Sequence, residues 1–98
     1  METLSTDLPT HFVLNQNYPN PFNPTTTINY SIPKESFVTI KIYDLLGKEV
    51  ATLVDEFQKP GTYNYQLSIS NYQLSSGVYF YQLQAGNFIA TKKLILLK

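Results

Sequence analysis

Three residue types are missing from this chain of 98 residues: cysteine, tryptophan and arginine. Without cysteine the chain can form neither a disulfide framework nor a thiolate metal site, so side-chain packing and strand pairing must hold the fold together. Without both cysteine and tryptophan, the Cys–Trp–Cys core of an antibody-type domain is excluded. Without arginine the chain lacks the best bidentate ligand for phosphate and carboxylate groups, which argues against a phosphate-handling role.

Net charge and long apolar runs are also lacking. Seven basic and seven acidic side chains give a formal net charge of zero, which leaves no electrostatic footprint for nucleic acid or an anionic lipid surface. The longest apolar run, Leu94 to Leu97, is far shorter than the roughly 20 residues that a membrane-spanning helix needs. We therefore predict no nucleic-acid partner and no transmembrane helix. The length predicts one domain with a single small core, and we expect a monomer.

The polar residues do not form a pattern that is typical of catalysis. Among the carboxylates only Asp55 and Glu56 are adjacent, and this pair predicts a solvated turn because neighbours on an extended chain point apart. His11 has no second histidine to complete a zinc site. Ser75-Ser76-Gly77 lacks the flanking glycine and the following helix of a nucleophile elbow. We predict a domain that is not an enzyme and that has no cofactor and no metal site.

Strand-forming residues are abundant, with eight tyrosines and six phenylalanines beside many threonines, valines and isoleucines. Apolar and polar side chains alternate in short runs between turn residues, and the runs predict strands at 12–14, 27–32, 38–42, 50–54, 63–69, 79–85 and 88–97. A helix over Asp44 to Glu56 is the only rival, and Gly47 together with β-branched residues argues against it. The fold class is therefore predicted as all-β, an immunoglobulin-like antiparallel β-sandwich of about seven strands.

The first residues differ from the rest of the chain. Residues 1–11 are polar and lack periodicity, and we interpret them as a linker or expression remnant ahead of a domain at 12–98. They also lack the basic and apolar regions of a secretory signal, so an exported protein would need such a signal further upstream.

A proline-asparagine segment spans Asn17 to Pro24. Its three prolines, Pro19, Pro21 and Pro24, cannot donate backbone hydrogen bonds, so the segment cannot be a central strand. We expect Tyr18 and Phe22 to pin it to the sandwich. Two interpretations remain: a rigid entry loop that covers a sheet edge, which we favour, or a polyproline-type ligand for an aromatic groove.

The C-terminal run also has two interpretations. It is rich in leucine and isoleucine and carries Lys92, Lys93 and Lys98. Such a strand at a sheet edge can pair with a partner, or it can simply close the sandwich with lysines that guard against aggregation.

The tyrosines raise the separate possibility of sugar binding by stacking. Most of them fall at inward strand positions, which favours core packing, and the exceptions are Tyr18, Tyr43 and Tyr72.

Five stretches of the chain, taken in order, match one known pattern: 14–26, 42–50, 60–61, 74–83 and 92–94. Through them the chain resembles, over about residues 12–98, the C-terminal sorting domain of the type IX (Por) secretion system, type A. The immunoglobulin-like domain of flagellar hook-capping proteins is related and shares the Tyr-Asp-Gly hairpin and the Gly-Val-Tyr strand. That domain usually carries a Trp-Asp-Gly turn where Ile69-Ser70-Asn71-Tyr72 stands here.

The resemblance implies that the domain is a label on a secreted cargo. The cargo would reach the periplasm, and its label would be recognised by the outer-membrane translocon and then be removed by a surface sortase-like protease or used for anchoring. The implied location is secreted or at the cell surface, and the implied partners include an N-terminal cargo domain in the full-length protein. The alternative is a carbohydrate-binding or adhesive module appended to a secreted hydrolase.

The resemblance also implies roles for particular residues. Translocon recognition would use residues of the last strands, namely Gly77, Tyr79, Lys93, Leu94 and Lys98. The structural motif of the family would correspond to Tyr18, Pro19, Pro21, Phe22, Pro24, Asp44 and Gly47.

Overall fold

The structure, a computed structural model, describes residues 8–98, so most of the expected linker at 1–11 lies outside the described residues. The strands are β1 (Val13–Leu14), β2 (Thr25–Ile32), β3 (Ser36–Tyr43), β4 (Glu49–Gln58), β5 (Gly61–Ser68), β6 (Gly77–Ala85) and β7 (Phe88–Leu96). A single turn of 3₁₀ helix, η2 (Ile69–Asn71), follows β5. The described chain contains no α-helix, in agreement with the rejection of a helix around Gly47.

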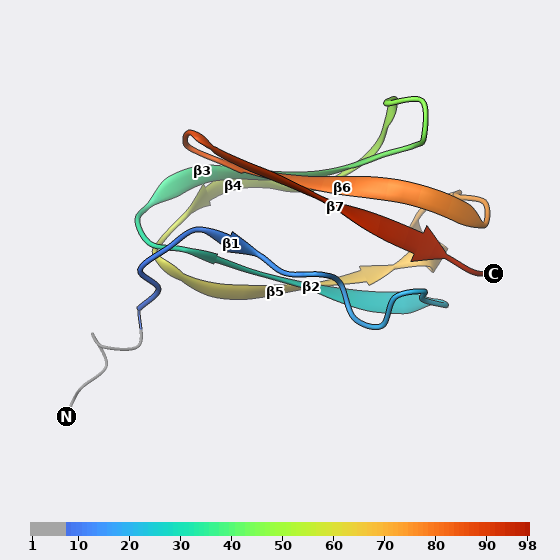
Figure 1. Cartoon of the computed structure of the whole chain (residues 1–98), viewed down its shortest axis with the longest axis horizontal. Coiled ribbons are helices and arrows are strands. Elements are labelled where there is room, and N and C mark those ends of the chain that lie inside the picture. The colour runs from blue at the N-terminus through green and yellow to red at the C-terminus, as the bar shows by residue number, and fades with distance from the viewer. Residues whose placement is uncertain (1–7) are drawn as a thin grey trace.

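The strands form two antiparallel sheets that face each other (Figure 1). One sheet has the order β1-β2-β5 and the other the order β4-β3-β6-β7. The chain crosses from one sheet to the other between β2 and β3, between β4 and β5 and between β5 and β6, whereas β1–β2, β3–β4 and β6–β7 pair within a sheet. The predicted all-β sandwich is confirmed.

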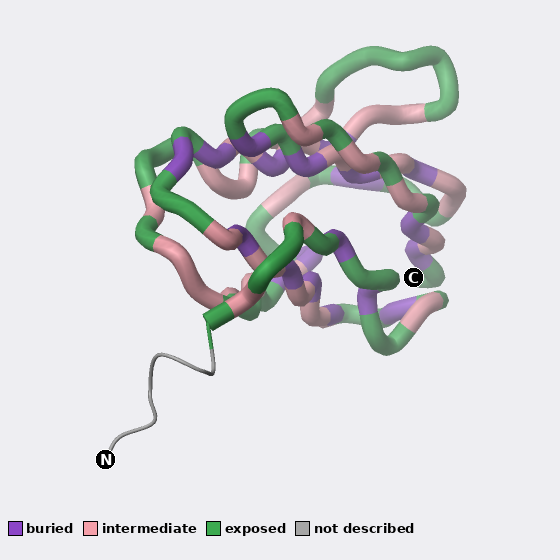
Figure 2. Tube along the Cα trace, turned by 60° about the vertical axis from the view of Figure 1, so that its left-hand side comes forward, coloured by how far each residue is buried: buried purple, intermediate pink, exposed green. Residues whose placement is uncertain are grey.

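The core lies between the sheets and comes from the alternation seen in the sequence. In β2 every second side chain is buried, and β3 and β6 alternate in the same way because side chains on a strand point to opposite faces. Figure 2 shows the resulting alternation of buried and exposed segments along the strands. Tyr30 and Tyr81 are fully buried between the sheets, so these tyrosines pack the core as expected.

One local prediction was wrong. Asp55 and Glu56 do not form a turn but lie inside β4, where both side chains are exposed. The ladder continues past them because Phe57 pairs with Phe37 of β3, and the two rings meet edge to face with centroids 5.0 Å apart. Because β4 pairs with β3 alone, it is an edge strand, and its charges remain in water.

Candidate functional site

The proline-asparagine segment meets the last strand. The backbone N–H of Phe22 donates to the carbonyl of Ile95 at 3.0 Å, and the N–H of Leu97 donates to the carbonyl of Phe22 at 3.1 Å. Phe22 thus forms a parallel bridge to the end of β7, and its ring is only 2% exposed. These contacts agree with a loop that covers a sheet edge and with the expected anchoring by Phe22.

The expectation for Tyr18 was wrong. Its backbone pairs with Thr27 through two hydrogen bonds of 3.0 Å, but the side chain is 81% exposed. The physical reason is the strand alternation: Asn17 occupies the inward position and is buried, so the next side chain faces solvent. Pro19, Pro21 and Pro24 carry no backbone N–H, and all three lie in the connection between Tyr18 and the start of β2.

Amide side chains complete the junction between the segment and β7. The Gln16 side-chain amide donates to the backbone carbonyl of Lys93 at 2.6 Å. The backbone N–H of Ile95 donates to Oδ1 of Asn20 at 2.9 Å. Both contacts join residues that are more than seventy positions apart in the chain, 77 and 75 respectively.

A buried hydroxyl joins the same segment to β6. The Tyr81 hydroxyl accepts a hydrogen bond of 2.8 Å from the backbone N–H of Asn17 and donates one of 2.7 Å to the carbonyl of Asn15. Burial raises the pKa of this hydroxyl to about 12, so it keeps the proton that it donates to the carbonyl well above the pH at which an exposed tyrosine titrates.

The outer edge of β7 is divided into two halves. Its odd-numbered residues direct their backbone N–H and C=O groups away from β6. The N–H and C=O of Ile95 and the N–H of Leu97 are hydrogen-bonded to the proline-asparagine segment. Over residues 8–98, the corresponding groups of Ile89 and Thr91 have no partner. Addition of a partner strand, which the sequence suggested, is therefore blocked at the second half of β7, and at the start of the first half the ring of Phe12 already stacks on that of Phe88.

The residues expected to contact the translocon fall into two sets. Lys93 and Lys98 are exposed, whereas Leu94 is fully buried in the core. Tyr79 is also buried, and its hydroxyl donates to the carbonyl of Ser75 at 2.7 Å, as in the tyrosine corner of immunoglobulin-like domains. Gly77 begins β6 with a φ of +153°, which residues with a side chain rarely adopt. In the folded domain Leu94 and Tyr79 thus pack in the core beneath the exposed residues of the last strands.

Asp44 and Gly47 build the turn between β3 and β4. One carboxylate oxygen, Oδ1 of Asp44, accepts hydrogen bonds of 2.9 Å from the backbone N–H groups of Leu46 and Lys48. Gly47 adopts a φ of +86° and donates its N–H to the carbonyl of Asp44 at 3.0 Å. Leu45 and Leu46, which are exposed in this turn, were not among the site residues predicted from the sequence. The signal that could have found them is two leucines in a turn, where polar residues are usual.

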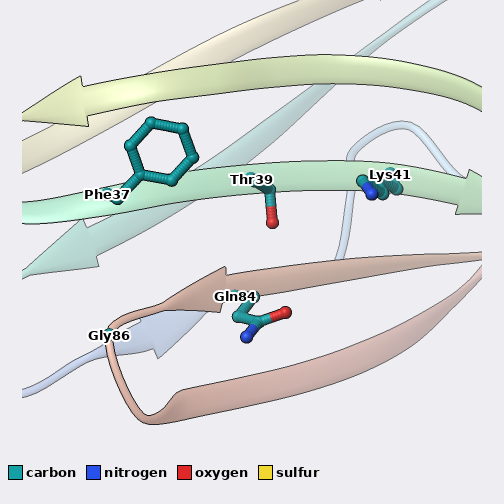
Figure 3. Close-up of a pocket in the computed structure, with 5 residues that line it drawn as sticks. All are labelled: Phe37, Thr39, Lys41, Gln84 and Gly86. Atoms are coloured by element: carbon teal, nitrogen blue, oxygen red, sulfur yellow. The ribbon is translucent and has the colours of Figure 1, made fainter.

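The surface depressions are lined by few ionisable side chains. One of about 290 Å³ lies on the outer face of the four-stranded sheet and is lined by Phe37, Thr39, Lys41, Gln84 and Gly86 (Figure 3). Its one ionisable group, Lys41, lies 3.4 Å from the carboxylate of Glu49. Within residues 8–98 no three His, Cys, Asp or Glu side chains gather to hold a metal ion. The same part of the chain contains no helix that is long and apolar enough to cross a membrane.

Comparison with known proteins gives one match. No curated protein and no solved structure matches the chain. The model of one family, described as the secretion system C-terminal sorting domain, matches residues 16–97. This range includes both the proline-asparagine segment and the last strand, which the fold brings together. The chain therefore belongs to the family of type IX secretion C-terminal sorting domains, which mark proteins that pass through the periplasm to the cell surface or the medium.

Proposed function

We propose that this domain is the signal by which the type IX outer-membrane translocon recognises a cargo protein joined ahead of it. The observation that carries the proposal is the family match over residues 16–97. The geometry supports it, because the proline-asparagine segment and β7 form one hydrogen-bonded unit that displays Lys93 and Lys98. Recognition at this unit, with no chemistry performed by the domain itself, is the function that the site fits best.

The folded unit begins near Phe12. Its ring stacks on that of Phe88, with centroids 5.1 Å apart, so the chain is anchored to the start of β7 from this residue onward. We assign residues 1–11 to a linker between cargo and signal. A surface sortase-like protease would cut in this linker, and the cargo would then be released or anchored at the cell surface.

The structure offers less support for a carbohydrate-binding module. Such a role needs a platform of exposed rings, and of the three tyrosines considered for it only Tyr18 is largely exposed. Tyr43 and Tyr72 are half-buried. One exposed tyrosine does not form the tyrosine platform that the alternative relied on, and sorting, which the family match over residues 16–97 supports, is the better proposal.

The test is export of a fluorescent reporter that carries a periplasmic signal peptide and is joined ahead of residues 1–98. We expect the reporter at the surface or in the medium of a bacterium with an intact type IX system. In a translocon-deficient mutant it should stay in the periplasm. Retention of the intact, folded fusion in both strains would overturn the proposal.

A charge reversal tests the exposed lysines within the same assay. Lys93→Glu combined with Lys98→Glu should reduce export, whereas Lys59→Glu, in the connection between β4 and β5, should not. Deleting residues 93–98 is a poorer test because it removes Leu94 and Leu96 from the core, and unfolding alone would stop export.

A further inference from the structure

Two adjacent leucines project into water at the tip of the β3–β4 turn. The side chain of Leu45 is 66% exposed and that of Leu46 is 94% exposed. Figure 1 shows this turn extending from the sandwich, and Figure 2 shows it as exposed. A single exposed leucine is ordinary, but a pair at a protruding tip places apolar area where it is available to a partner.

Hydrogen bonds fix the backbone of the turn that carries these side chains. The Asp44 carboxylate bonds the backbone N–H groups of Leu46 and Lys48, and Gly47 supplies the positive φ that closes the loop. Because the backbone is already ordered, a partner that binds the tip does not have to order it. Such preorganisation favours binding through a small number of anchor residues.

The tip lies beside the end of the last strand. Leu45 and Leu46 line a depression of about 250 Å³ together with residues 75–79 at the start of β6. The backbone N–H of Lys98 donates to Oγ of Ser76 at 2.8 Å, which ties the end of the chain to the same place. We call Leu45, Leu46, Lys48, Ser76 and Lys98 the C-terminal tip surface.

The charge of this surface indicates which kind of partner surface can bind it. Lys48 and Lys98 are both exposed. The side-chain carboxylates that flank the two leucines in the sequence are already engaged, that of Asp44 by backbone N–H groups and that of Glu49 by Lys41. The surface is therefore apolar with a basic margin, and an apolar pocket with a carboxylate at its rim complements it.

We propose that the C-terminal tip surface is where the domain docks onto the type IX translocon, with Leu45 and Leu46 as the anchors. The partner presents an apolar pocket that takes the two leucines and an acidic rim that faces Lys48 and Lys98. Strand addition along β7 is not available here, because the adjoining half of that strand is already paired with the proline-asparagine segment. The contact is made instead by the side chains at the tip. This inference rests on the sorting function proposed above.

The test is export of the reporter joined ahead of residues 1–98 and carrying Leu45→Ser with Leu46→Ser. We expect export to fall by about tenfold or more, the size of effect that loss of a binding anchor produces. Leu45→Met with Leu46→Met keeps the apolar area and should keep export. The matched control is Phe57→Ser with Ile89→Ser, which removes side chains that are 69% and 57% exposed near the end of β4 and the start of β7, and this variant should be exported normally.

The outcomes separate the two proposals. If the wild-type reporter is exported without the translocon, or not at all, the sorting function fails. If wild type and the serine pair are exported equally, only the docking surface fails. An unchanged denaturation midpoint for the serine pair should accompany its loss of export, because both leucines are exposed.

Crosslinking gives a second measurement that does not depend on folding energetics. The chain has no cysteine, so Leu46→Cys provides a unique site for a thiol-reactive photocrosslinker, and Phe57→Cys is its control. In cells with the intact system, we expect position 46 to crosslink to a component of the outer-membrane translocon and position 57 not to do so. Equal crosslinking from both positions, or from position 57 alone, would overturn the proposal.

Discussion

The backbone N–H of Asn17 lies 2.8 Å from the hydroxyl oxygen of Tyr81, 64 positions further along the chain, and donates a hydrogen bond to it. Through this contact the proline-asparagine segment is fixed to the centre of β6 as well as to the edge of β7. The proline-asparagine segment thereby fixes the position of the C-terminal strand β7 on the sandwich.

Tyr81→Phe should destabilise the domain by about 1–3 kcal/mol, because the buried N–H of Asn17 and the carbonyl of Asn15 both lose their partner. Urea denaturation of the purified domain measures this difference. A free energy of unfolding equal to that of wild type would show that water replaces the hydroxyl and that the contact contributes nothing to stability.

The same hydroxyl predicts a dependence on alkaline pH. Burial raises the pKa of Tyr81 to about 12, whereas a tyrosine in an unfolded chain titrates near 10. The native state therefore holds its proton where the unfolded state has lost it, so this contribution to stability is complete below about pH 10 and is lost as pH rises towards 12. The free energy of unfolding of wild type should fall more steeply across this window than that of Tyr81→Phe. Parallel pH profiles would contradict the assignment.

Tyr79→Ala should cost on the order of 3 kcal/mol, because it leaves a cavity beneath the start of β6 and removes the bond to Ser75. Tyr79→Phe keeps the ring and should cost only about 1 kcal/mol. A denaturation midpoint unchanged in the alanine variant would refute the inward position of this ring.

Asp44→Ala should cost about 1–2 kcal/mol, since the backbone N–H groups of Leu46 and Lys48 lose their common acceptor. Hydrogen exchange at these two amides should become faster, and thermal denaturation should report the loss of stability. Unchanged exchange would mean that the turn keeps its shape without the carboxylate.

The two halves of the β7 edge should respond differently to proline. Thr91→Pro removes an N–H that has no partner within residues 8–98, whereas Ile95→Pro removes the N–H that is bonded to Asn20. We expect Ile95→Pro to cost about 1–2 kcal/mol more than Thr91→Pro. Equal losses of stability would argue against the division of this edge.

The local pattern of the sequence determined most of the strands. Alternation of apolar and polar residues has the period of a strand, so it located β2, β3 and β6 and placed Tyr79 and Tyr81 in the core. The prolines between Asn17 and β2 excluded a central strand for the same local reason, because they lack the N–H that a ladder requires. The order of the motifs identified the family, and the family match over 16–97 agrees with it.

Only the tertiary structure decided which surfaces are open. Periodicity cannot tell that Phe22 occupies the edge of β7, because that contact joins positions far apart in the chain and depends on which sheet edges meet. The inward position beside Tyr18 is taken by Asn17, a polar residue that is buried because it bonds Thr26 and the hydroxyl of Tyr81, so an apolar-polar pattern wrongly assigned Tyr18 to the core. The exposure of Leu46 likewise follows from the turn built by Asp44, whose carboxylate holds the backbone in a loop that projects from the sandwich.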